Sequence, residues 1–151
     1  MRTADHPLSD PDSPGYRVRL PGTWQSLHPL RRGLGEWLGA ILPESGPRFD
    51  LVLVGSELFA TAVRADRSDT STAFAVAAWV EGHSVVIEVR QSHESIDRAG
   101  RGIESDEASR ALAVVAAIVE VLQVQARGGL LLRAKTQVAP SDRRFQAGTA
   151  G

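Results

Sequence analysis

The side chains that most often carry catalysis or bind metals are few and scattered in this sequence. The chain has no cysteine, which excludes disulfides, cysteine-ligated zinc, iron–sulfur clusters and a cysteine nucleophile. The four histidines are His6, His28, His83 and His93. They lack the spacing of metal ligands, and Ser56 and Ser92 lack the Gly-x-Ser-x-Gly context of a hydrolase nucleophile. The sequence therefore predicts neither a metal site nor a serine-hydrolase triad.

Composition is that of one globular domain. The 151 residues include 17 Lys+Arg and 18 Asp+Glu, giving a net charge of −1, and 42% are hydrophobic. A near-neutral charge argues against non-specific binding to nucleic acid or to an anionic membrane. The longest apolar runs, Leu51–Val54 and Ala111–Val119, are far shorter than a membrane span. We expect a soluble, cytoplasmic protein.

Both ends of the chain have the composition of disordered segments. Residues 1–15 are rich in proline, serine and aspartate and have no secretory signal, and residues 139–151 are small and polar. We expect a disordered leader, one folded domain over residues 16–138 and a disordered tail.

Periodicity in the first half predicts one strand, two helices and a hairpin. Alternation over Tyr16–Leu20 indicates a strand, and Thr23 is a candidate N-cap for the first helix. Apolar side chains spaced by three and four predict the two helices. In the first they are Leu27, Leu30, Leu34, Trp37 and Ile41, and in the second, over Arg48–Arg64, they are Leu51, Val54, Leu58 and Ala62. Strands Ala73–Glu81 and Ser84–Arg90 form a hairpin that turns at Gly82-His83.

The second half predicts a helix and another hairpin. After a polar loop, Gln91–Ser105, a third helix begins with Asp106 and Glu107 in its first turn. Its apolar stripe is Leu112, Val115, Ala116, Val119 and Leu122. Strands over Gln123–Ala126 and Leu130–Thr136 follow, turning at Gly128-Gly129. We expect Trp24, Trp37 and Trp79 to pack in the core. The fold class predicted is α/β (α+β), a two-layer sandwich in which three helices cover one face of a mixed, mostly antiparallel sheet.

Four segments in this order resemble histidine-kinase-like ATPase (Bergerat-fold) domains, and among them the bacterial anti-sigma-factor serine kinases. Residues 56–64 (SELFATAVR) resemble that family's "SELVTNAVRH" helix, and residues 85–92 (VVIEVRQS) resemble its "IEVRDS" strand. Residues 109–115 (SRALAVV) resemble its "GRGLxLV" helix start, and residues 128–132 (GGLLL) its closing "GGKTVW" turn. The resemblance implies the histidine-kinase-like ATPase fold.

The resemblance also assigns candidate site residues, most of them altered. In the family, a glutamate on the second helix serves as catalytic base, and an asparagine four residues later, on the same helical face, holds Mg²⁺. This chain keeps the glutamate as Glu57 and has Thr61 at the asparagine position. The family's aspartate, which accepts a hydrogen bond from the adenine amino group, is Gln91 here. Threonine has an oxygen but is shorter than asparagine and lacks its amide carbonyl, so it matches the family's metal ligand poorly.

The phosphate-binding loop departs most from the family pattern. Glycines let backbone N–H groups approach phosphates at a helix start, but the matching residues are Ser109, Arg110 and Ala111 instead of Gly-Arg-Gly. Asp106 and Glu107 nearby would repel a triphosphate. Gly100-Arg101-Gly102 is an alternative match, although it lies about nine residues too far from Gly128-Gly129.

These changes imply a degenerate ATPase domain that has kept the fold and lost catalysis. No metal and no cofactor are expected, and the protein would act by binding a protein partner such as a sigma factor or an anti-sigma antagonist. Family members commonly self-associate, so a homodimer is a further expectation, and direct nucleic-acid or membrane binding is not. One alternative is an active serine/threonine-protein kinase that uses Glu57 as base with ATP and Mg²⁺. Another is an oligomerisation subunit for an intact homologue.

Overall fold

The computed structural model describes residues 15–42, 46–65, 72–91, 106–125 and 130–137. Its elements follow the predicted order of strand, two helices, hairpin, helix and hairpin. They are β1 (Gly15–Pro21), the short 3₁₀ helix η2 (Trp24–Ser26), α2 (Leu27–Ile41), α3 (Gly46–Ala65), β2 (Ala73–Glu81), β3 (Ser84–Gln91), α5 (Asp106–Ile118), β4 (Val121–Gln125) and β5 (Leu131–Gln137). The leader, the tail, Gly100-Arg101-Gly102 and Gly128-Gly129 lie outside the described residues, except that Gly15 already belongs to β1.

One five-stranded sheet forms the first layer, in the order β1-β2-β3-β5-β4. Each of its four strand pairings is antiparallel. The sheet built from the described residues therefore lacks the parallel pair that a mixed sheet would contain. The β2–β3 hairpin turns at Gly82, whose φ of 62° is readily adopted only by glycine. The predicted α+β fold class is confirmed.

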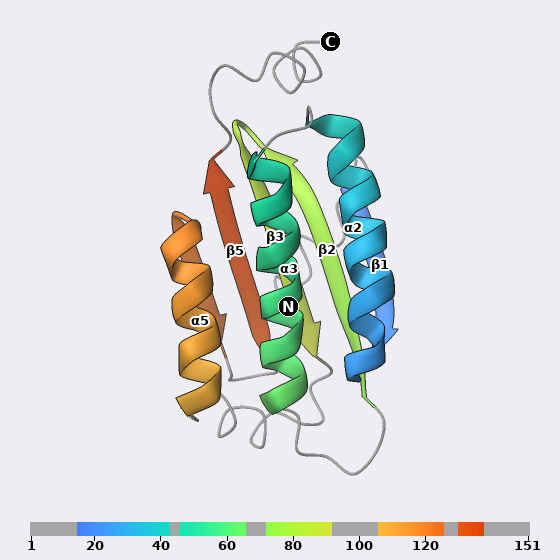
Figure 1. The fold of residues 1–151 in the computed structure, drawn as a ribbon, viewed down its shortest axis with the longest axis vertical. Coiled ribbons are helices and arrows are strands. Elements are labelled where there is room, and N and C mark those ends of the chain that lie inside the picture. The colour runs from blue at the N-terminus through green and yellow to red at the C-terminus, as the bar shows by residue number, and fades with distance from the viewer. Residues whose placement is uncertain (1–14, 43–45, 66–71, 92–105, 126–129, 138–151) are drawn as a thin grey trace, which may run out of the picture.

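Three helices form the second layer and cover one face of this sheet, with α3 between α2 and α5 (Figure 1). Alternate residues of β2 and β3, among them Val76, Ile87 and Val89, face the helices and are buried. From α2 the leucines at 30, 34 and 38 complete the core. Leu30 and Leu34 were on the predicted stripe and Leu38 was not, while Leu27, Trp37 and Ile41 are partly buried against the core. None of the described helices is long and apolar enough to span a membrane.

The third helix is shorter than its apolar stripe predicted. The backbone N–H of Val119 still donates to the carbonyl of Val115, but the N–H of Glu120 donates to Lys135 of β5. The chain therefore leaves the helix at Ile118, and Leu122 lies on β4. Ala116, predicted on the apolar stripe, is exposed. The helical stripe was wrong beyond Val115 because the local pattern carries no information about pairing with β5.

Two features near the start of α2 also differ from the prediction. The expected N-cap Thr23 precedes η2 and forms no side-chain capping hydrogen bond. Trp24, expected in the core, is 50% exposed, and the guanidinium of Arg64 lies 5.4 Å from its ring centroid. Trp37 is partly buried against the core, as expected. Trp79 is also partly buried, but its position on β2 alternates with Val76 and Ala78, which places it on the opposite face of the sheet.

Candidate functional site

The predicted site residues gather at one end of the sandwich. The C-terminal half of α3, the end of β3, the start of β5 and the first turn of α5 all lie at the lower end of the molecule in Figure 1. The fold thereby brings to the same end segments that are far apart in sequence, namely Glu57–Thr61, Gln91 and residues 109–111. Their arrangement decides whether a nucleotide site is still present.

Thr61 is fully buried on α3, at 0% exposure. Its Oγ1 donates a hydrogen bond to the backbone carbonyl of Glu57, 2.8 Å away. This bond to the carbonyl four residues earlier is a common one for threonine inside a helix. A magnesium ion binds one or two protein oxygens and keeps several waters, and a hydroxyl with no exposed surface cannot reach such an ion. Thr61 therefore does not fit the role of the metal-binding asparagine.

Glu57 is half-buried on the turn of α3 that precedes Thr61. Its carboxylate forms no ion pair with another described residue. The neighbouring Ser56 is buried, and its Oγ accepts a hydrogen bond from Nε of Arg31 on α2, at 3.0 Å. Ser56 is thus part of the α2–α3 contact. A half-buried carboxylate remains chemically able to act as a base.

Gln91 ends β3 on the helix-covered face and is buried, with 3% of its surface exposed. Its backbone N–H donates to the carbonyl of Leu130, 3.0 Å away, which joins the end of β3 to the residue before β5. Both atoms of its side-chain amide are buried, and neither finds a partner among the described residues. A buried amide without partners costs roughly 1–3 kcal/mol.

Residues 109–111 belong to α5, because this helix begins at Asp106. Only the first four N–H groups of a helix lack a partner within it. The N–H groups of Arg110 and Ala111 come after those four and donate along the helix, so they are not presented to a ligand. Ser109 is the last of the four. Arg110 is exposed. The segment that resembles a phosphate loop is therefore the beginning of a regular helix.

Arg64 and Trp24 lie at the same end of the molecule and were not identified from the sequence. The Arg64 guanidinium stacks over the Trp24 ring, and its Nη1 is buried without a partner among the described residues. Forty residues separate the two, and neither belongs to a motif that would have signalled the pair.

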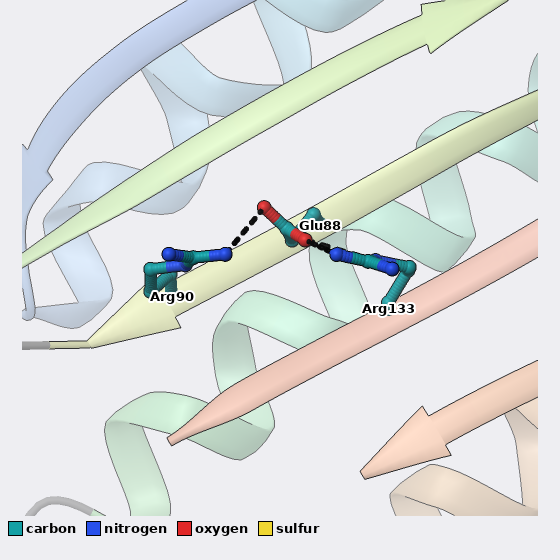
Figure 2. A network of polar contacts seen from close by, with 3 residues as sticks. All are labelled: Glu88, Arg90 and Arg133. Carbon is teal, nitrogen blue, oxygen red and sulfur yellow. Dashed lines mark hydrogen bonds and ion pairs between the residues drawn. The ribbon is translucent and has the colours of Figure 1, made fainter. Parts of the chain in front are cut away.

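A second polar cluster lies on the sheet face opposite the helices. Glu88, on β3, is fully buried, and its Oε2 accepts hydrogen bonds from Nε of Arg133, at 2.9 Å, and from Nη2 of the same residue. Its Oε1 lies 3.6 Å from Nη2 of Arg90 (Figure 2). The Arg133 guanidinium also lies 5.9 Å from the centroid of the Trp79 ring. An isolated glutamate in the apolar run VVIEV of β3 was the available sequence signal, and it was missed.

The described residues contain no group of three His, Asp or Glu side chains placed to hold a metal ion. His28 and His83 are exposed, and His6 and His93 lie outside the described part of the chain.

Comparisons with known proteins agree on the fold. No protein-family model matches the sequence, and no curated protein matches it. Among solved structures, the chain is similar to the crystal structure of the RsbU and RsbW domains of Rv1364c from Mycobacterium tuberculosis, with a TM-score of 0.62 and 21% sequence identity. The match covers 83% of this chain and 32% of that one, so this chain spans about a third of the length of that protein. The chain has an RsbW-like, histidine-kinase-like ATPase fold.

Proposed function

We propose that this protein is a non-catalytic, anti-sigma-type regulator that acts by binding a protein partner in bacterial transcriptional or developmental control. The partner would be a sigma factor or an anti-sigma antagonist. The fold shared with a structure that contains an RsbW domain supports the class of protein. The loss of catalysis is supported mainly by Thr61, whose buried hydroxyl donates to the Glu57 carbonyl where a magnesium ligand would be needed.

Two further observations favour a site that no longer serves a nucleotide. The helix α5 already includes residues 109–111, so its backbone does not present a glycine-lined cradle to phosphates. The amide of Gln91 is enclosed, and replaces a carboxylate that would accept from adenine. An active serine/threonine kinase would instead need Glu57 beside a bound Mg-ATP.

Calorimetric titration of Mg-ATP and Mg-ADP into the whole chain tests the loss of catalysis. We expect no binding up to millimolar nucleotide. Micromolar, magnesium-dependent binding would overturn this part of the proposal, and loss of phosphotransfer to a partner serine in Glu57→Ala would then establish a kinase.

A double variant separates the two causes of the loss. Thr61→Asn with Gln91→Asp restores both side chains of the family pattern but leaves α5 unchanged. We expect this variant to remain without Mg-ATP binding, because the backbone of residues 109–111 still donates along the helix. Binding by the double variant would mean that side chains alone had closed the site.

Partner binding is tested separately. Sigma factors and antagonist domains encoded in the same genome are immobilised one by one, and the chain is passed over each. Saturable binding to one of them, unchanged by Mg-ATP, is the expected result. Failure to bind any member of either set would refute the assignment of the partner class.

A further inference from the structure

Every arginine and lysine of the described strands lies on one face of the sheet. The helices α2, α3 and α5 all lie on the other face (Figure 1). Strand residues alternate between the two faces, and residues directly opposite each other in register share a face. The register therefore defines a basic face, opposite the helices, that consists of Arg17 and Arg19 of β1, Arg90 of β3, and Arg133 and Lys135 of β5. Arg17 and Arg19 are exposed and the other three are partly exposed, so their cationic groups are accessible.

The acidic side chains of the basic face do not balance this charge. Among the described strand residues they are Glu81 and Glu88. Oε1 of Glu81 lies 3.3 Å from Nζ of Lys135 in an exposed ion pair. Glu88 is fully buried between Arg90 and Arg133, so one carboxylate faces two guanidinium groups (Figure 2). The basic face therefore keeps a net positive charge, although the whole chain has a net charge of −1.

Glu88 also orients two of the arginines before any partner binds. It accepts hydrogen bonds from Nε and Nη2 of Arg133, and its Oε1 lies 3.6 Å from Nη2 of Arg90. A guanidinium group carries five N–H donors, so both arginines retain donors for a further acceptor. Side chains that are already ordered lose less conformational entropy on binding. The centre of the basic face is thus prepared for an anionic group.

The spacing of these cations fits the carboxylates of an extended polypeptide. Arg17 and Arg19 are two residues apart on β1, as are Arg133 and Lys135 on β5. Two residues of a strand span about 6.6–6.8 Å, which is also the repeat of the side chains on one side of an extended segment. Carboxylates form bidentate hydrogen bonds with arginine. An extended segment with acidic residues at alternate positions therefore complements the basic face in charge and in spacing.

Other occupants fit this face less well. A second copy of the chain would place like charges against each other. Nucleic acids that lie on a sheet stack their bases on aromatic side chains, but Trp79 is the only aromatic residue that the described strands place on this face. Trp79 is partly buried, and the Arg133 guanidinium lies 5.9 Å from its ring centroid. An acidic protein segment is the occupant that these observations favour.

We propose that the basic face is a docking surface for an extended, acidic segment of a partner protein, whose carboxylates pair with Arg19, Arg90, Arg133 and Lys135. This inference deepens the proposed function, on which it rests for the existence of a protein partner. It adds the surface on which that partner binds and the chemistry of the segment that is bound.

Fluorescence anisotropy with synthetic probes tests the chemistry of the bound segment. The whole chain is titrated into a labelled peptide of alternating glutamate and threonine, and into a neutral peptide in which glutamine replaces each glutamate. We expect saturable binding of the acidic peptide only, weakened by salt because exposed charges are screened beyond about 10 Å at 0.1 M. Equal binding of the two peptides would overturn the proposal. An oligothymidylate of the same charge that binds as tightly as the acidic peptide would also overturn it, in favour of a nucleic acid.

Charge reversals test the location of the surface. Arg19→Glu and Lys135→Glu each reverse one accessible cation of the basic face, and circular dichroism checks that both variants are folded. Loss of one exposed ion pair changes affinity by up to about fivefold, and reversal adds a repulsion, so we expect each variant to bind the acidic peptide at least about threefold more weakly. Arg32→Glu, on α2, is the matched control, since it makes the same charge change on a side chain that is 73% exposed in the helical layer. Reversals that weaken binding no more than this control would overturn the location.

The same variants separate this surface from the proposed function. Each is passed over the immobilised sigma factors and antagonist domains beside the unaltered chain. We expect a partner that binds the unaltered chain and Arg32→Glu equally, and both reversals of the basic face more weakly. A partner that binds all four proteins equally would overturn the docking surface and leave the proposed function intact. Binding of the acidic peptide without binding of any sigma factor or antagonist would support the surface and refute the proposed partner class.

Discussion

Glu88 allows the sharpest test of how the sheet face opposite the helices is stabilised. Its carboxylate is fully buried, whereas the side chains of its two arginine partners keep about a quarter of their surface exposed. In the variant Arg133→Met most of the apolar stem of the side chain is kept, and the two hydrogen bonds to Oε2 are lost. Glu88 would then rely on Arg90 alone, whose Nη2 lies 3.6 Å from Oε1.

The expected loss follows from the burial of the carboxylate. Removing one partner of a buried ion pair costs about 3–5 kcal/mol, mostly because a charge is left buried and unpaired. The remaining contact with Arg90 places Arg133→Met at the lower end, so we expect about 3 kcal/mol less free energy of unfolding. In a chain of this size that corresponds to a fall of about 10 °C in Tm.

A double variant identifies the cause of this loss. Glu88→Met combined with Arg133→Met removes both charges and keeps similar volumes. Replacement of a whole buried ion pair by apolar side chains is often neutral or stabilising, so the double variant should be more stable than Arg133→Met alone. Arg90 then extends its partly exposed guanidinium to water.

Urea unfolding of the three proteins, followed by circular dichroism, provides the measurement. Differences are read from the midpoint at constant slope, because a change in slope would indicate an altered denatured state or a transition that is not two-state. A loss below about 1 kcal/mol in Arg133→Met would refute the argument, since that is the range of an exposed pair. A double variant no more stable than the single one would assign the loss to packing and not to the unpaired charge.

Three further predictions concern single residues. Burial, and secondarily the charge of Glu36, raise the pKa of Tyr16 above its ordinary value of 10.0. Above about pH 10 the unfolded chain therefore releases this proton first, and the free energy of unfolding falls. Urea unfolding between pH 8 and 11 should show a smaller fall in Tyr16→Phe than in the wild type, and an equal fall would contradict this prediction. Gln91→Leu removes a buried amide without a described partner and should raise the free energy of unfolding by about 1 kcal/mol. A lower free energy of unfolding in the same assay would reveal a partner for the amide. In Gly55→Ala the new Cβ would lie 2.5 Å from Cδ2 of the buried Leu34. The cost of overpacking, about 1–3 kcal/mol, should exceed the gain of about 1 kcal/mol in helix propensity, so we expect a lower Tm. A Tm at or above that of the wild type would show that α2 adjusts freely.

The order of elements could be predicted because its signals are local. Strand alternation in Tyr16–Leu20, the leucines of α2 and the Gly82 turn each depend on residues a few positions apart, and all were confirmed. The end of α5 could not be predicted, since the N–H of Glu120 pairs with Lys135. The apolar residues between Leu112 and Leu122 fit one longer helix as well as they fit a helix that ends before a strand.

The candidate site shows the same division between local and distant contacts. The hydrogen bond of Thr61 is local, because it reaches the carbonyl four residues earlier in the same helix. By contrast, the backbone hydrogen bond of Gln91 reaches Leu130, 39 positions along the chain, and the pairing of Glu88 with Arg133 crosses 45 positions. A single sequence does not reveal such pairs, which is why the burial of Gln91 was not predicted and Glu88 was overlooked.

In the proposed loss of a nucleotide site, side chain and backbone would contribute differently, and this difference would explain how a resemblance to ATPases could persist without their chemistry. At Thr61 and at Gln91 only the side chain differs from the family pattern. Thr61 is compatible with α3 and Gln91 with β3, because neither substitution alters the backbone. The start of α5 at Asp106 is a change of backbone, since a helix over residues 109–111 pairs the N–H groups that a phosphate loop would leave open. The sheet and the core do not depend on those groups. The fold is therefore retained whether or not this end binds a ligand.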